Sequence, residues 1–178
     1  MIWLALGLAA CSSKDTGTAD SSENGDRTPP LDPIVLPYTG WSYVLPELDP
    51  LYAHDDTAEP CPSVGYGAEN GFFEVETDYC AIATFRQAIT GAVSKGEVLH
   101  FVVWNLDLWA PEPYDAQRLL RMGSTELWSD VVRVPGNEDV SEIEVVVSED
   151  MPAGTEAWFH LRNHGVNSWR LGDVERAP

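Results

Sequence analysis

The sequence predicts an antiparallel β-sandwich, and two observations lead to this fold class. From Trp41 onward, glycine, proline, asparagine or aspartate interrupts the chain at short intervals. Several segments alternate apolar and polar residues, as a strand with one buried face does. The chain shows no internal repeat and no sustained helical period. We therefore expect about seven to nine short strands that pack as two sheets.

The expected strands follow a loop region at residues 41–70, which is rich in turn residues. They span residues 71–76, 80–89, 97–109, 116–122, 125–128, 130–134, 141–148, 155–162 and 167–175. Residues 97–109 are apolar on both faces, which is typical of a central strand. Residues 141–148 alternate glutamate with isoleucine and valine, which indicates a half-buried strand. Residues 115–122 are the one segment for which a helix competes with a strand.

The N-terminus carries a short apolar segment that ends at a cysteine. Residues 1–10, MIWLALGLAA, are too few to span a bilayer but have the character of a signal-peptide core. Residues 8–11, Leu-Ala-Ala-Cys, resemble the lipobox of bacterial lipoproteins, and this resemblance implies that Cys11 is lipidated and becomes the new N-terminus. The residue after this cysteine is Ser12 rather than an aspartate, and in this the chain resembles lipoproteins that are sent to the outer membrane. We expect a lipid-anchored protein of the bacterial cell envelope, at the outer membrane; the alternative is a buried N-terminal segment with an incidental cysteine.

Residues 11–37 are expected to form a flexible acidic tether. They are rich in Ser, Thr, Asp, Gly and Pro, and such a segment buries too little apolar surface to offset its ordering entropy. The remaining residues, 38–178, are then a single sandwich domain, large enough to fold on its own hydrophobic core.

Cys61 and Cys80 remain after lipidation of Cys11, and they form an even pair in an exported domain. Because oxidising compartments favour disulfides, we expect the two to be joined. The alternative is a reactive thiol.

The charge of the chain excludes one class of partner. Its formal net charge is −19, from 29 acidic and 10 basic residues. A surface of this kind repels phosphates and offers few cations to displace their counterions, so we expect no nucleic-acid binding. A basic membrane-binding patch is excluded for the same reason.

The segment WFHLRNHGVNSWRL, residues 158–171, holds two of the four histidines. His160 and His164 have the spacing of a helical zinc motif, but the glutamate of that motif is absent. On a strand, residues four apart stand about 13 Å from each other. A metal site that uses both histidines is therefore not expected.

No enzyme motif is complete. The segment GAVSKGE, residues 91–97, has the glycine spacing of a phosphate-binding loop, but Glu97 replaces the required lysine. We therefore expect no enzymatic activity and no cofactor. An exported hydrolase, resembling a glycosidase, stays open as the alternative, because glycosidase carboxylates need no local signature.

Alternation in residues 155–162 predicts a ligand-binding face. One side carries aliphatic and aromatic core residues, and the other carries Trp158, His160 and Arg162. An aromatic ring beside hydrogen-bonding side chains suits stacking on a sugar. His100 and Trp104 share a face of residues 97–109 and would join this platform if the two strands are adjacent. The alternative is that a loop covers Trp158 and the polar side chains are ordinary surface residues.

The pattern of residues 70–176, which ends in NHGVNSWRLGDVE, is similar to the jelly-roll sandwiches of carbohydrate-binding modules and galactose-binding-like domains. The resemblance implies a ligand that is a sugar or another small polar molecule, and a structural calcium near the chain ends for which Glu74 and Asp173 are candidates. The alternative for both acids is surface solubility. We expect a tethered binding module for a glycan, a cell-envelope ligand or an envelope protein.

Overall fold

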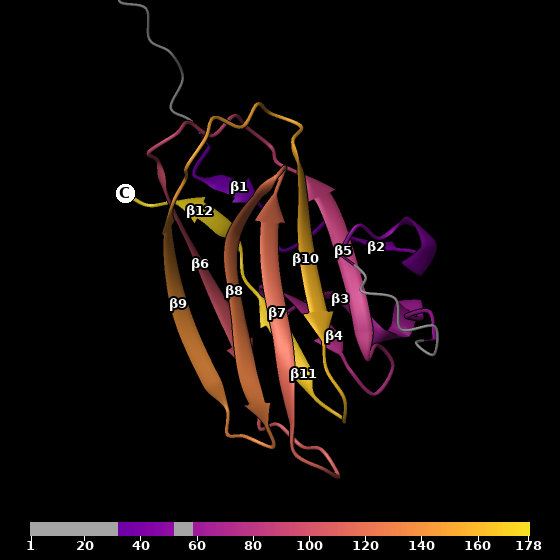
Figure 1. Cartoon of the computed structure of the whole chain (residues 1–178). Coiled ribbons are helices and arrows are strands. Elements are labelled where there is room, and N and C mark those ends of the chain that lie inside the picture. The colour runs from indigo at the N-terminus through magenta and orange to yellow at the C-terminus, as the bar shows by residue number, and fades with distance from the viewer. Residues whose placement is uncertain (1–31, 52–58) are drawn as a thin grey trace, which may run out of the picture. The chain divides into compact units, whose positions relative to one another are not determined.

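A computed structural model describes residues 32–51 and 59–178, which belong to one compact unit, Leu31–Pro178. The expected signal peptide, the lipidation at Cys11 and most of the tether lie outside the described residues. The described residues form twelve strands in two antiparallel sheets (Figure 1), which confirms the predicted β-sandwich. They hold only two short 3-10 helices, η1 (Pro46–Leu48) and η2 (Ser63–Gly65), and neither has the length of a membrane-spanning helix.

The larger sheet has seven strands in the order β1-β12-β6-β11-β4-β3, and β9 also pairs with β6. Its strands are β1 (Ile34–Leu36), β3 (Tyr66–Glu69), β4 (Phe72–Glu76), β6 (Val98–Asn105), β9 (Asp139–Val146), β11 (Ser168–Leu171) and β12 (Val174–Arg176). The smaller sheet has five strands in the order β2-β5-β10-β7-β8. They are β2 (Ser42–Val44), β5 (Ile82–Ala88), β7 (Tyr114–Met122), β8 (Thr125–Val134) and β10 (Glu156–Arg162).

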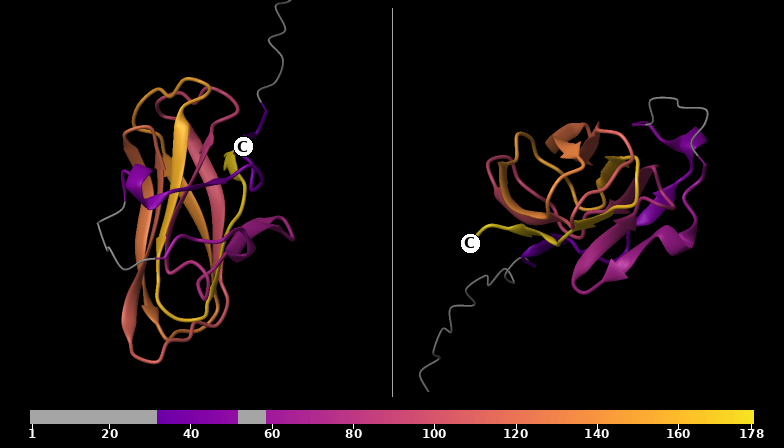
Figure 2. Two further views of the ribbon diagram at one scale, coloured as in Figure 1. Left: turned by 90° about the vertical axis from the view of Figure 1, so that its right-hand side faces the viewer. Right: turned by 90° about the horizontal axis from the view of Figure 1, so that it is seen from below.

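The two sheets lie face to face and enclose one hydrophobic core (Figure 2). The smaller sheet contributes Phe159 and Leu161 from β10, and the larger sheet contributes Phe101 and Trp169. Each of these side chains is at most 1% exposed. Full burial of such a side chain stabilises the fold by roughly 1.5–3 kcal/mol. The alternation seen in the sequence is therefore the pattern that holds the sheets together.

The folded part begins earlier than residue 38, which corrects the predicted boundary of the tether. Residues Ile34–Leu36 form β1, which pairs with β12. Val35 and Leu36 are 0% and 1% exposed. Their burial in the core offsets the entropy of ordering the segment.

Other element boundaries also differ from those predicted. The expected loop region at 41–70 contains β2 and β3, and residues 125–134 form one strand rather than two. The last expected strand is divided at Gly172 into β11 and β12. Residues 115–122 are a strand, so the competing helix is excluded.

The disulfide between Cys61 and Cys80 is present, as predicted, and ties the segment before β3 to the start of β5. The two cysteines are 19 positions apart, and Cys80 is fully buried. Reduction should lower the free energy of unfolding by about 3 kcal/mol, because an open chain of this length has more conformational freedom when unfolded. Urea denaturation of oxidised and reduced protein measures the difference. Two titratable thiols in the unreduced, exported protein would contradict the pairing.

Candidate functional site

The outer face of the five-stranded sheet is a regular grid of side chains. Trp158, His160 and Arg162 point away from the core on β10, as predicted, and all three are half-buried. The register of β10 with its neighbours, β5 and β7, sets what lies beside each of them. Thr84 and Leu119 flank His160, Ile82 and Gln117 flank Arg162, and Arg86 and Arg121 flank Trp158.

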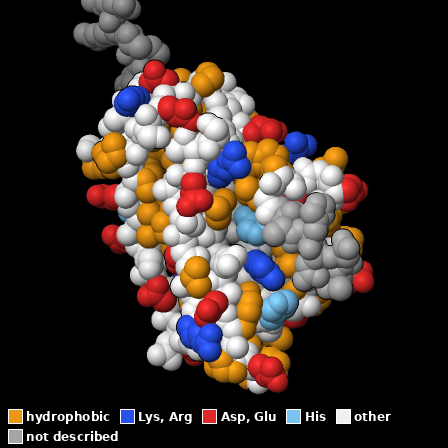
Figure 3. All heavy atoms as spheres, viewed as in Figure 1, with side chains coloured by type: hydrophobic (Ala, Val, Ile, Leu, Met, Phe, Trp, Pro, Cys, Tyr) orange, Lys and Arg blue, Asp and Glu red, His pale blue; other side chains and the backbone are white. Residues whose placement is uncertain are grey.

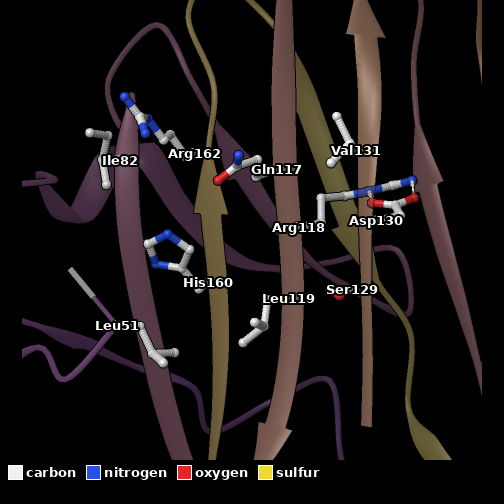
Figure 4. Close-up of a pocket in the computed structure, with 10 residues that line it drawn as sticks. All are labelled: Leu51, Ile82, Gln117, Arg118, Leu119, Ser129, Asp130, Val131, His160 and Arg162. Atoms are coloured by element: carbon white, nitrogen blue, oxygen red, sulfur yellow. Dashed lines mark hydrogen bonds and ion pairs between the residues drawn. The ribbon is translucent and has the colours of Figure 1, made fainter. Parts of the chain in front are cut away.

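Four strands and Leu51 together form a hollow on this face, with a volume of about 390 Å³. Its apolar lining includes Ile82, Leu119 and Val131, and its polar lining includes Gln117, His160 and Arg162. In Figure 3, blue side chains of the Lys and Arg class and pale blue histidines lie on this face among hydrophobic ones. In Figure 4, Arg162 and His160 both extend from β10 toward β5, and Gln117 lies on the side of β7.

His160 is tied to the neighbouring strand by a hydrogen bond, since its Nδ1 lies 2.7 Å from the buried Thr84 hydroxyl. Burial of the ring lowers the pKa of His160, while Asp49 opposes this effect and Arg162 adds to it. The imidazole is therefore neutral at neutral pH. A neutral ring can both donate and accept a hydrogen bond, as recognition of a hydroxyl group requires.

This lowered pKa makes stability depend on pH. The unfolded chain binds a proton at His160 more readily than the folded chain does. The neutral ring therefore contributes fully to the free energy of unfolding above the unfolded-state pKa of about 6.5, and this contribution is lost as the pH falls through the lower pKa of the folded state. His160→Gln should remove this part of the pH dependence. Urea denaturation at pH 7.5 and pH 5 measures it, with the exposed His164→Gln as the control. An identical pH dependence in His160→Gln and wild type would contradict the assignment.

Arg162 lies at the end of β10, where its backbone is held in place. Its carbonyl oxygen accepts a 2.6 Å hydrogen bond from the hydroxyl of Tyr114. Burial raises the pKa of Tyr114 to about 12, so this hydroxyl keeps its proton at neutral pH. Within the described residues, the guanidinium has no ion pair, and its buried Nε has no hydrogen-bond partner.

A buried ion pair that the prediction missed lies on the inner side of the same strands. Arg118 donates two hydrogen bonds to Asp130, of 3.0 and 2.6 Å. The Arg118 guanidinium is also within 5.3 Å of the Trp128 ring centroid and 5.0 Å of that of Trp169. A signal was present in the sequence, because Arg118 falls on the apolar side of the alternation in residues 116–122.

His100 and Trp104 do not join Trp158. They lie on β6 in the larger sheet, whereas β10 belongs to the smaller sheet, so the predicted shared platform is wrong in this part. Arg170 covers Trp104, with its guanidinium carbon 4.4 Å from the ring centroid. His100 lines a separate hollow of about 230 Å³ together with Phe72 and five other residues, namely Gly71, Val102, Gly172, Asp173 and Glu175.

Glu74 and Asp173, the calcium candidates, are engaged in other interactions. Glu74 accepts hydrogen bonds from Nε and Nη2 of Arg170, at 3.0 and 3.2 Å. Asp173 accepts a hydrogen bond from the backbone of Tyr38 at 2.5 Å. Within residues 32–51 and 59–178, no group of three His, Cys, Asp or Glu side chains gathers as a cation site. The calcium site therefore gains no support from the geometry.

Comparison with known proteins gives structural likeness only. No described protein family and no curated protein matches the chain. Similar solved structures include a family 16 carbohydrate-binding module (6% identity, 62% of this chain and 79% of that chain, TM-score 0.39). TmCBM61 in complex with β-1,4-galactotriose is another (12% identity, 79% of this chain and 90% of that chain, TM-score 0.34). A third is the arabinose-bound MgGH51 α-L-arabinofuranosidase (6% identity, 80% of this chain and 26% of that chain, TM-score 0.44). These identities and TM-scores are too low to assign a family or a ligand to this chain.

Proposed function

We propose that the protein is a non-catalytic binding module for a carbohydrate, and that the ligand occupies the hollow on the outer face of the five-stranded sheet. The observation that carries the proposal is the lining of this hollow, where Gln117, His160 and Arg162 stand beside aliphatic side chains. A sugar has an apolar ring face and polar edges, and this mixture complements both. The volume of about 390 Å³ lies within the usual range for small-molecule sites.

A hydrolase with two catalytic carboxylates is less well supported at this hollow. Among the described residues that line it, Asp130 is the only carboxylate, and Arg118 holds both of its oxygens. Glycosidases of the common type need a pair of acids on either side of the scissile bond. The hollow therefore favours binding without cleavage.

A glycan array probed with the purified full chain, followed by calorimetric titration of the sugars that bind, tests the proposal. Gln117→Ala should weaken binding about fivefold, as expected for the loss of one hydrogen bond. Arg133→Ala is the matched control, because Arg133 is an exposed cation on the same face outside the hollow. The proposal fails if no sugar binds or if Gln117→Ala binds as wild type does.

Trp158 tests whether the ligand extends along β10 beyond the hollow. Its ring is half-buried rather than fully covered, and it lies on the same face two positions before His160. Stacking on a sugar contributes on the order of 1 kcal/mol, so Trp158→Ala should weaken binding about fivefold if the ligand reaches it. Unchanged affinity in the folded variant would confine the ligand to the hollow.

We further propose that the module is anchored to the bacterial cell envelope through Cys11, at the outer membrane. Support comes from the lipobox-like residues 8–11 and the acidic, Ser-rich and Pro-rich segment that follows. Because stable attachment requires more than one acyl chain, Cys11→Ser should move the protein from the membrane fraction to the soluble fraction. Fractionation of cells that express each form measures this. The same membrane content in both forms would contradict the anchor.

A further inference from the structure

We propose that the hollow recognises a sugar that bears a carboxylate, and that Arg162 binds this carboxylate. The inference rests on the proposed function and narrows its ligand class to acidic saccharides. The basic residues in the described part of the chain are Arg86, Lys95, Arg118, Arg121, Arg133, Arg162, Arg170 and Arg176. Five of these eight form ion pairs with aspartate or glutamate, and Arg162 does not. It is the only one of the three others that lines the hollow.

The charges of the hollow do not balance. Asp130, the only carboxylate among its described lining residues, is already neutralised by Arg118 through two hydrogen bonds. His160 is neutral, because burial lowers its pKa. Arg162 thus leaves the described lining with one net positive charge, in a chain whose net charge is −19. Asp49 does not line the hollow, but its charge acts on His160 from nearby. With so many acidic residues in the chain, an unbalanced cation in a ligand-sized hollow marks a place for an anionic group of the ligand.

The position of Arg162 also suits this role. The Tyr114 hydrogen bond fixes its backbone, and the half-buried side chain extends above Ile82 toward β5 (Figure 4). Its Nε is buried and lacks a hydrogen-bond partner within the described residues. A guanidinium also presents its two terminal nitrogens as a planar fork, which matches the two oxygens of a carboxylate. Because Nε has almost no accessible surface, a ligand carboxylate would pair with these terminal nitrogens.

The rest of the lining favours a single negative charge on a sugar ring. One unbalanced guanidinium matches one carboxylate, whereas a phosphate monoester carries close to two negative charges at neutral pH. Leu119 and Val131 offer an apolar surface to the ring. The amide of Gln117 and the neutral ring of His160 can donate to or accept from its hydroxyl groups. The class of ligand that fits is therefore a uronic acid within a saccharide.

Calorimetric titration with trisaccharides of galacturonic, glucuronic and mannuronic acid tests the inference, each beside its neutral methyl ester. For at least one acid, the wild-type full chain should bind the free acid about tenfold more tightly than the ester, as a charge-assisted bidentate pair allows. Arg162→Gln should abolish this preference, so that the variant binds the free acid and its ester with equal affinity. Arg162→Lys, which keeps the charge but loses the fork, should retain part of it. Arg133→Ala, which removes a charge outside the hollow, should retain all of it.

The outcomes separate this inference from the proposed function. Equal affinity of the wild type for every acid and its ester overturns the carboxylate assignment, and the proposed function then stands if Gln117→Ala weakens both. A preference for the acid that survives Arg162→Gln overturns the role of Arg162. If neither acids nor esters bind, and the glycan array is also negative, both the inference and the proposed function fail.

Discussion

Asp130→Ala is expected to lower the free energy of unfolding by about 3 kcal/mol, because it leaves the guanidinium of Arg118 buried without a counter-charge. Arg118 is 3% exposed and its guanidinium lies near the rings of Trp128 and Trp169, so little of it is open to water. We place the effect at the lower end of the range for buried pairs, since the side chain of Asp130 is 32% exposed. Urea denaturation measures it.

A second ion pair joins the same two strands and provides the control. The distance from Nη1 of Arg133 to Oδ1 of Asp115 is 2.8 Å, but the two side chains are 62% and 59% exposed. Asp115→Ala should therefore cost no more than about 1 kcal/mol. The double variant Arg118→Met with Asp130→Ala should recover most of the lost stability, because methionine fills the space without a charge. If Asp130→Ala and Asp115→Ala cost the same, the buried-charge account is wrong.

Local alternation in the sequence was sufficient to predict most strands and the direction of their side chains. In β10 it separated Phe159 and Leu161, which enter the core, from His160 and Arg162, which line the hollow. The prediction succeeds because one face of a half-buried strand requires apolar side chains and the other accepts polar ones, and this alternation can be recognised within a few residues. Very short strands were missed for the same reason. The segment of β1 lies between Pro33 and Pro37 and has no room to show a period.

Strand pairing could not be predicted in this way. Strand β10 follows β9 in the chain but pairs with β5 and β7, and β6 lies in the other sheet. Which strands become neighbours depends on long-range packing, and nothing in the sequence near His100 or Trp158 specifies it. The hollow was therefore found only in the structure, since β5, β7, β8 and β10 all contribute to it. The ion pair of Arg118 could have been suspected, because a charged residue in a core register requires a partner.

The turn after β10 positions Arg162 through a small buried network centred on Thr77. The Thr77 hydroxyl accepts a hydrogen bond from the Asn163 side chain at 2.6 Å and lies 2.8 Å from the carbonyl oxygen of Gly165. Asn167 extends the network, since its side-chain oxygen accepts from the backbone of Trp109 at 2.5 Å. The three polar residues, Thr77, Asn163 and Asn167, are at most 4% exposed. Gly165 is the point where this turn reverses direction, with φ of 102°.

Gly165→Ala should lower the free energy of unfolding by about 3 kcal/mol, from backbone strain and overpacking together. At this φ a side chain is strained, and the added Cβ would overlap the carbonyl oxygen of Trp109. Because backbone cannot move aside as a flexible side chain can, the turn and the end of β10 must shift.

Gly154→Ala is the matched control, since φ is 85° there and no atom lies within 4 Å of the added Cβ. It should cost about 1 kcal/mol, from strain alone. Urea denaturation of both variants measures the difference, and equal losses would show that the contact with Trp109 does not constrain the turn.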